Sequence, residues 1–187
     1  MSNFAIDARL FNRLNLSVDI YDKNTSDLLY YVRLASITGV ENQWQNVGKL
    51  NNRGVEITLN TDIVRGDDFN WDFDFNIGFN KNEIKEMYNG QSQITGKKNY
   101  TEGHDMNEWF MREWAGVDQA TGAPMWYIHN EDGTKETTTD YASATRELLD
   151  KSSAPDFFGG FSTSLSYKNV NLSANFGYAY GNYIYHS

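Results

Sequence analysis

Between positions 69 and 80 the chain alternates strictly between two kinds of side chain. One parity reads Phe69, Trp71, Phe73, Phe75, Ile77 and Phe79. The other reads Asn70, Asp72, Asp74, Asn76, Gly78 and Asn80. Successive side chains of a β-strand point to opposite faces, whereas helical spacing explains neither series. This stretch therefore predicts a strand with one apolar face and one face of polar or small residues.

Five further stretches alternate in the same way. They predict strands over residues 4–10, 13–21, 54–63, 161–167 and 170–180. Together with 69–80 they make six strands and an all-β fold. The one place where we expect helix is a short stretch around residues 142–149. No apolar run approaches the ~20 residues that a membrane helix needs, and no signal peptide is visible after Met1.

The connections between these strands alternate in length. Tight turns are expected around residues 11–12, 64–68 and 168–169, and long segments over 22–53 and 81–157. In an antiparallel sheet all the short turns then fall at one end and both long segments at the other. Short periplasmic turns and long outer loops are typical of outer-membrane barrels. The sequence thus predicts an antiparallel, up-and-down transmembrane β-barrel segment of about six strands with long outer loops.

The two faces agree with that prediction. The apolar parity is rich in aromatic rings, and Tyr178, Tyr180, Tyr183 and Tyr185 would lie near the outer rim, as in an aromatic girdle. The opposite parity is rich in Asn, Ser, Asp and Gly, which suits a wet lumen. The alternative is a soluble β-sandwich module that binds glycans. Phe73 and Phe75 separate the two, because they face lipid in a barrel and a second sheet in a sandwich.

Several kinds of chemistry are not expected. The chain has no cysteine, which excludes disulfides and thiolate metal sites, and its net charge of -9 argues against binding nucleic acid. No pattern for nucleophilic catalysis is present, so we expect no enzyme and no cofactor. His104, Asp105 and Glu108 match no strong metal motif. Asp72 and Asp74 share a strand face that meets water, which needs no catalytic explanation.

The long segment after residue 100 carries most of the charge. Between residues 101 and 157 there are twelve acidic and four basic residues, which leaves -8 of the chain's -9. Such a segment is either a solvated surface or a surface that meets a partner or divalent ions. Trp109, Trp114 and Trp126 lie in it and are the candidate contacts with substrate or partner. They would either stack on sugars or pack the segment against itself.

Glycine and Asx patterns predict turns at three places. These are residues 118–122, Asp132-Gly133, and 51–54, where a turn or bulge would lead into a strand. Gly54 is suited there to an unusual backbone angle.

Motifs in order along nearly the whole chain resemble one family. Residues 46–56, Asn-Val-Gly-Lys-Leu-Asn-Asn-Arg-Gly-Val-Glu, look like the N-x-G-x-x-x-N-[KR]-G-[VI]-E signature of SusC/RagA TonB-dependent outer-membrane transporters. Residues 17–29 and 114–124 resemble two further segments of that family. So do residues 102–104, and residues 158–182 resemble its late hairpin.

The resemblance implies import of oligosaccharides or peptides through a barrel of about 22 strands around a plug. It also implies TonB, a SusD-like surface lipoprotein and outer-membrane lipid as partners, in a Gram-negative bacterium of the Bacteroidetes type. Residues 1–187 have room for only part of such a barrel, and neither a plug nor most of the other strands is expected in them. The substrate and the oligomeric state are not readable from the sequence.

Overall fold

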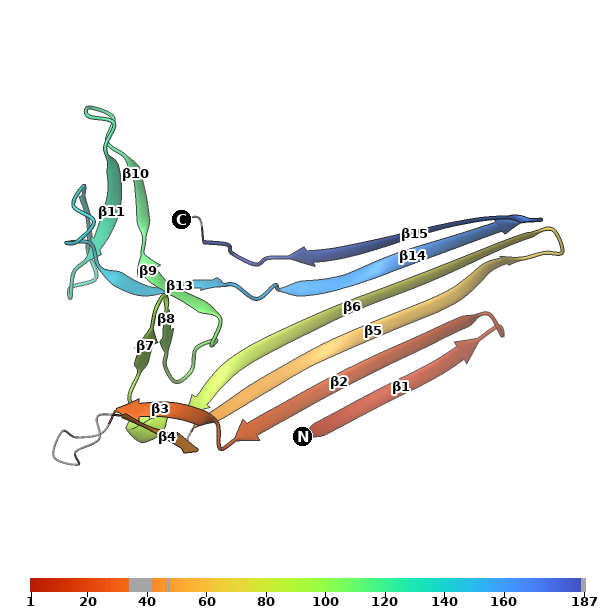
Figure 1. Cartoon of the computed structure of the whole chain (residues 1–187), viewed down its shortest axis with the longest axis horizontal. Helices are drawn as coiled ribbons and strands as arrows, with labels where there is room; N and C mark the ends of the chain where they lie inside the picture. Colours follow the sequence, from red (N-terminus) through yellow and green to blue (C-terminus); the bar gives the residue numbers. More distant parts are fainter. Residues whose placement is uncertain (34–41, 47, 186–187) are drawn as a thin grey trace.

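A computed structural model describes residues 1–33, 42–46 and 48–185 of the chain. Its main feature is one six-stranded sheet in the order β1-β2-β5-β6-β14-β15, in which every neighbouring pair is antiparallel (Figure 1). The strands are β1 (Ser2–Leu10), β2 (Leu14–Ser26), β5 (Lys49–Arg65), β6 (Phe69–Glu86), β14 (Phe157–Tyr167) and β15 (Val170–Tyr180). All six predicted strands are therefore confirmed, and they neighbour one another in chain order apart from the short strands of the loops.

The register gathers the apolar parities of all six strands on one face. One row across the sheet pairs Ala8 with Leu16, Leu16 with Leu59, Leu59 with Phe75, Phe75 with Phe161 and Phe161 with Phe176. The row of opposite parity contains Arg9, Asn15, Asn60, Asp74, Ser162 and Asn175. We call these the apolar face and the polar face of the sheet.

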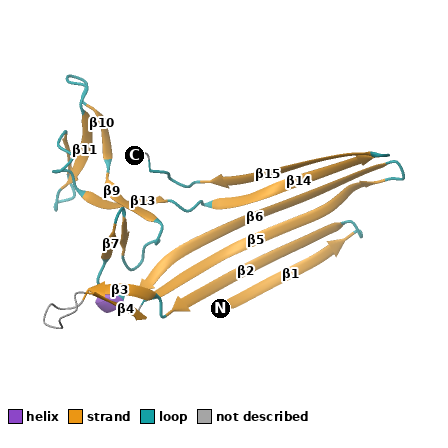
Figure 2. Cartoon of the chain, in the orientation of Figure 1, coloured by secondary structure: helices purple, strands orange, loops and turns teal. Residues whose placement is uncertain are grey.

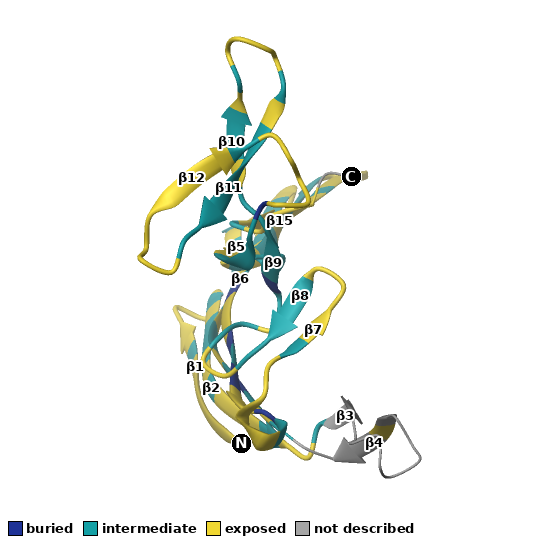
Figure 3. Ribbon diagram, turned by 90° about the vertical axis from the view of Figure 1, so that its left-hand side faces the viewer, coloured by how far each residue is buried: buried dark blue, intermediate teal, exposed yellow. Residues whose placement is uncertain are grey.

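No second sheet covers the apolar face within the described part of the chain. Figure 3 looks at the sheet from the end that carries the long loops and shows a single layer of strands. Phe73 and Phe75 are half-buried, although a lipid-facing side chain should be exposed when no lipid is present. The reason is contact within the face: the Phe73 ring stacks 6.3 Å from Phe161, and the Phe75 ring 6.4 Å from Tyr178. The two-layer packing of a β-sandwich is therefore ruled out.

All three short turns lie at one end of the sheet, which we call the turn end (Figure 2). Phe11 and Asn12 both have positive φ, 53° and 54°, as a type I′ hairpin turn requires. Lys168 has φ 53° in the last hairpin. The remaining connections, residues 27–48 and 87–156, lie at the opposite loop end. This alternation of short and long connections was predicted from the sequence.

The strands of the middle hairpin are longer than expected. β5 has 17 residues and β6 has 18, whereas 9–11 residues are enough to cross a membrane in a tilted barrel. Most of their additional residues extend at the loop end, where the ammonium of Lys49 lies 2.5 Å from the carboxylate of Glu86. β5 also has a register shift between Asp62 and Val64, near the turn end.

The first loop segment, residues 27–48, contains the hairpin of β3 (Leu29–Arg33) and β4 (Asn42–Asn46). Residues 34–41 of this segment lie outside the described residues, as does Val47 of the signature motif.

The second loop segment, residues 87–156, folds into short β elements beyond the strand ends (Figure 1). It starts with a 3₁₀ turn at Tyr88–Gly90, followed by the hairpin of β7 (Gln93–Thr95) and β8 (Lys98–Tyr100). β9 (Glu108–Arg112) pairs with β13 (Arg146–Ser152). β10 (Trp114–Val117), β11 (Pro124–His129) and β12 (Lys135–Thr138) form a three-stranded sheet. The predicted turns at 118–122 and 132–133 connect these three strands and are confirmed.

The helix expected around residues 142–149 is wrong. Residues 141–143 form a turn, and β13 begins at Arg146 and pairs with β9. The guanidinium of Arg146 donates to the carbonyls of Gly96 and Phe110, at 2.6 and 3.2 Å. Pairing with β9 satisfies the backbone hydrogen bonds of β13 in an extended conformation. The sequence of residues 142–149 by itself does not reveal this pairing.

The turn or bulge expected over residues 51–54 is also wrong, because these residues continue β5 without a break. Gly54 has no positive φ. Its role is to allow close approach: an added Cβ would collide with the carbonyl oxygen of Phe79 and the ring of Tyr21. The Tyr21 hydroxyl donates to Asn80 at 2.9 Å across this glycine.

The most buried described side chains gather at the loop end, where the second loop segment meets β5 and β6. Ile84 and Met87 are the buried apolar residues there, with exposures of 2 and 5%. The backbone of Ile84 exchanges hydrogen bonds with Gly103 and His104, at 2.8 and 2.9 Å. These contacts anchor the second loop segment to the sheet. None of the described helices is long and apolar enough to span a membrane.

Candidate functional site

Two of the three candidate tryptophans form one aromatic cluster on the three-stranded sheet. The rings of Trp114 and Trp126 meet edge to face at 5.8 Å, and Trp126 meets Tyr141 at 5.0 Å. The Arg112 guanidinium lies 4.4 Å from the Tyr141 ring centre. Trp126 is thus the centre of the cluster, whereas Trp114 is 54% exposed at its edge. The register that pairs Trp114 with Trp126 explains the contact.

Trp109 lies apart from this cluster. Its indole N–H donates to the Tyr183 carbonyl at 2.8 Å, and the Lys98 ammonium lies 3.7 Å from the ring centre. Lys98 also donates to Ser153 Oγ at 3.0 Å and to the carbonyl of Asn107. Burial lowers the pKa of Lys98, against the opposing effect of Asp105 and Glu108. Trp109 therefore ties the second loop segment to the chain after β15.

The polar face carries one aromatic ring that the sequence analysis missed. Phe158 pairs with Gly78 and Ala179, on the same face as Asp74, and is 46% exposed. Its ring covers Gly78, where an added Cβ would lie 3.3 Å from a ring carbon. The sequence did contain a signal for this placement. If the alternation of residues 161–167 is continued back to Phe157, Phe158 falls on the polar face.

Hydrogen bonds between side chains cross the rest of the polar face. Asp74 accepts from Asn60 at 2.7 Å and from Ser162 at 3.0 Å, so one carboxylate connects β5, β6 and β14. Ser164 and Ser173 lie 2.7 Å apart on β14 and β15. Nearer the loop end the signature residue Asn52 accepts from Asn82 at 2.9 Å. These groups present a hydrated surface of amides, hydroxyls and carboxylates.

The trio His104, Asp105 and Glu108 does not converge on one point. His104 Nδ1 lies 2.9 Å from Glu108 Oε2, and the other oxygen of Glu108 accepts from the Asp150 amide at 2.9 Å. Asp105 turns away and accepts from Ser152 Oγ at 2.7 Å. These groups hold β9, β13 and the preceding turn together.

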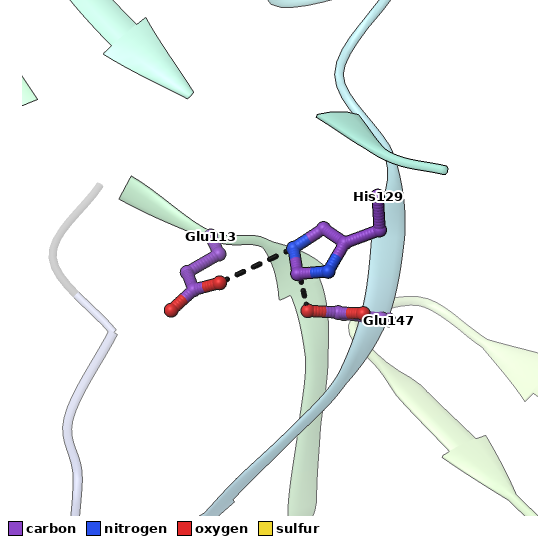
Figure 4. Close-up of side chains that lie close together, drawn as sticks. All are labelled: Glu113, His129 and Glu147. Atoms are coloured by element: carbon purple, nitrogen blue, oxygen red, sulfur yellow. Dashed lines mark ion pairs between the residues drawn. The ribbon is translucent and has the colours of Figure 1, made fainter. Parts of the chain in front are cut away.

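A different cluster does converge, and the sequence analysis missed it. Glu113 lies between β9 and β10, His129 ends β11 and Glu147 belongs to β13 (Figure 4). His129 Nε2 lies 2.7 Å from a Glu147 oxygen and 3.2 Å from a Glu113 oxygen. One ligand atom from each residue fits within 4.8 Å of the others. Residues 34 positions apart in the chain give no local spacing by which this cluster could be recognised.

Lys135 completes the surroundings of that cluster. Its ammonium lies 2.8 Å from the same Glu113 oxygen that faces His129. The hydrogen bond from Lys135 lowers the pKa of Glu113, and the same bond raises the pKa of Lys135. The His129 Nε2 atom is shielded from solvent and makes no well-directed hydrogen bond despite its two carboxylate neighbours.

Comparison with known proteins gives a consistent family. The family described as "TonB dependent receptor-like, beta-barrel" matches residues 3–185. TonB-dependent receptor P26 of Formosa agariphila is 31% identical over 98% of this chain and 20% of its own length. TonB-dependent receptor SusC of Bacteroides thetaiotaomicron is 27% identical over 98% of this chain and 19% of its own length. This chain spans about a fifth of these relatives.

Solved structures agree with the sequence relatives. The RagAB peptide importer in its "open-open" state matches with a TM-score of 0.86 and 34% identity, over 96% of this chain and 20% of the matched chain. The RagAB peptide transporter matches with a TM-score of 0.84 and 34% identity, over the same shares of the two chains. The expected resemblance to SusC and RagA is thereby confirmed, and the relatives are receptors rather than enzymes. The chain belongs to the TonB-dependent receptor β-barrel family, an outer-membrane family, and forms an antiparallel section of such a barrel.

Proposed function

We propose that residues 1–187 form part of the wall and outer loops of a TonB-dependent importer in the outer membrane, with the plug and most other barrel strands lying outside this chain. The observation that carries the proposal is the two-faced sheet. Its apolar face is continuous over six strands and has no covering layer among the described residues, as contact with lipid requires. Its polar face carries the hydrated groups expected of a lumen.

The cargo proposed is an oligosaccharide or a peptide. Both present many hydrogen-bonding groups, and the lumenal amides, hydroxyls and carboxylates complement either class. Phe158 supplies an apolar ring to the same surface, on which a sugar ring or a peptide side chain would stack. The similarity to the RagAB peptide importer favours peptides, and the similarity to SusC keeps oligosaccharides as the second class to test.

The proposed partners are a SusD-like surface lipoprotein and TonB. In this topology the loop end faces the outside, and the second loop segment presents the exposed Trp114 and 12 of the chain's 25 acidic residues there. A SusD-like surface lipoprotein would contact these outer loops, and TonB would act through the part of the protein that holds the plug. The family and the relatives from Formosa and Bacteroides support this arrangement.

Uptake by the organism that carries the protein tests the proposal. We expect deletion of the gene to lower uptake of either labelled peptides or labelled oligosaccharides, and the wild-type gene to restore it. Loss of TonB should have the same effect as the deletion. Unchanged uptake of both classes after deletion would contradict the proposal.

Two variants refine the test. Phe158→Ala should lower uptake without lowering the amount of protein in the outer membrane, because the ring is exposed to the proposed lumen. Trp114→Ala should lower uptake or lipoprotein capture, whereas Trp126→Ala should loosen the second loop segment, because Trp126 is the packed centre of the cluster.

A further inference from the structure

We infer that Glu113, His129 and Glu147 form a binding site for a divalent transition metal such as Zn²⁺ in the outer loop. Figure 4 shows the carboxylates of Glu113 and Glu147 on two sides of the imidazole edge that carries Nε2. The three side chains come from three separate segments of the chain. A metal there would connect the β9–β10 junction, β11 and β13.

The donor set selects the kind of metal. A neutral imidazole nitrogen with carboxylate oxygens suits Zn²⁺, whereas Ca²⁺ and Mg²⁺ prefer sites made of oxygen alone. Bonds of 2.0–2.1 Å in a tetrahedral site place ligand atoms roughly 3.3 Å apart. The distance from His129 Nε2 to Glu113 is 3.2 Å and that to Glu147 is 2.7 Å, so the second must lengthen by about half an ångström. A side-chain rotation of Glu147, which is one-third exposed, provides that change.

The backbone around the cluster fixes the three ligands independently of any metal. The Tyr127 amide donates to the Glu113 carbonyl at 3.0 Å, and the Thr145 amide donates to the Tyr127 carbonyl at 3.2 Å. The His129 amide donates to Thr145 Oγ1 at 3.1 Å. These bonds join the three segments that carry the ligands, and each bond is made at a ligand residue or at a residue two positions away from one. The site is therefore organised before a metal arrives, which lowers the cost of binding.

The His129 ring has the environment of a ligand rather than of a satisfied core histidine. Its Nε2 atom is closed to solvent and has no well-directed hydrogen bond, although two carboxylates face it. Leaving such a buried polar atom without a hydrogen bond is unfavourable. A metal between the carboxylates and Nε2 satisfies the nitrogen's lone pair and balances the two negative charges.

Lys135 is the competitor for this site. It lies opposite His129 in the β11–β12 register and already neutralises part of the charge on Glu113. Its ammonium and a metal ion repel each other, so removal of Lys135 should strengthen metal binding. A structural salt bridge without a metal function would show no such gain.

Zinc titration of the whole outer-membrane protein that carries this chain tests the inference. The protein is purified in detergent without a polyhistidine tag, stripped with a chelator and titrated with ZnCl₂ in a calorimeter. We expect His129→Ala and Glu147→Gln each to lower the affinity for one equivalent of zinc by at least about tenfold. The matched control is His104→Ala, which removes the histidine of the other His–Glu pair in the same loop and should leave binding unchanged.

Lys135→Met keeps all three ligands and should raise the affinity for that same equivalent of zinc. If His129→Ala disturbs the fold, the wild-type protein still gives an answer: bound Co²⁺ should show a d–d absorption band that Zn²⁺ abolishes. Bound zinc should also slow proteolysis of residues 87–156, because it connects three segments. The inference is overturned if wild-type protein binds neither ion, or if folded His129→Ala binds zinc as the wild type does.

Discussion

At the scale of single residues, Gly54 shows how the signature motif serves the sheet. Gly54→Ala places a methyl group against the Phe79 carbonyl and the Tyr21 ring, so we expect a loss of about 1–3 kcal/mol of stability. The matched control is Gly177→Ala on the same face, where an added Cβ meets only the Gly159 oxygen at 4.0 Å. Heat-modifiable mobility in gels measures the folded fraction. Equal folded fractions for both variants would contradict the role given to Gly54.

A second residue-scale prediction concerns the turn between β10 and β11. The Ala120 amide donates to Asp118 at 2.8 Å, and this bond with the Thr121 hydroxyl lowers the pKa of Asp118 below its usual 3.8. Because the pKa of Asp118 is lower in the folded turn, the ionised carboxylate stabilises the turn above pH 3.8. That stabilisation is lost as the pH falls through the folded pKa. Hydrogen exchange at Ala120, corrected for its intrinsic rate, should therefore accelerate at low pH.

Asp118→Asn provides the control for that titration. The amide oxygen of asparagine still accepts the hydrogen bond in an Asx turn, but it does not titrate. Protection of the Ala120 amide should then be independent of pH between about 2 and 6, a range that brackets the usual carboxyl pKa. A pH dependence that survives in Asp118→Asn would show that another group controls the turn.

The roles of single residues were harder to predict from the sequence than the face of the sheet on which each residue lies. The sequence placed Gly54 in a turn because glycine favours unusual backbone angles, whereas its extended backbone instead allows Tyr21 to lie over it. That contact joins residues 33 positions apart and has no local signature. The cluster of Glu113, His129 and Glu147 escaped detection for the same reason. The three tryptophans were identified, but not that Trp109 lies apart from the other two.

At the scale of secondary-structure elements, the alternation along β6 defines which residues tolerate charge. Phe75→Arg places a cation on the apolar face at mid-strand and should cost about 2–4 kcal/mol in the membrane. Asn76→Arg, one position along, places it on the polar face, where it stays hydrated. Surface level and heat-modifiable mobility should fall for the first variant only. Equal values for the two would contradict the assignment of lipid and lumen.

The strands were predictable where one face is apolar, because that face imposes a two-residue alternation on the sequence. Residues 69–80 alternate because one side contacts apolar surroundings, so their strand and its faces followed from the sequence. The last residues of β6, 81–86, are mostly polar and lie beyond the apolar face. The alternation therefore ends although the strand continues. β13 was mistaken for a helix because its strand character depends on pairing with β9. The paired residues Glu147 and Met111 lie 36 positions apart in the chain, so local sequence does not reveal the pairing.

At the scale of the whole molecule, the described residues leave one face and two edges of the sheet without partners. The edge strands are the most exposed: Ile6 in β1 is 53% exposed, and Leu172 and Phe176 in β15 are 65 and 53% exposed. Each has a neighbouring strand on one side only. Unpaired backbone groups along both edges are templates for pairing with another chain. In a complete barrel, further strands would pair with β1 and β15.

The 187-residue chain expressed by itself should therefore aggregate in water. An uncovered apolar face of six strands is far larger than the few hundred Å² that soluble monomers expose, and edge pairing adds a second route to association. We expect inclusion bodies without detergent, and strand-rich circular dichroism after refolding into detergent micelles. Sedimentation measures the outcome. A stable monomer without detergent would show that the apolar face is covered, and it would contradict both the lipid-facing assignment and the proposed place of this chain in a barrel wall.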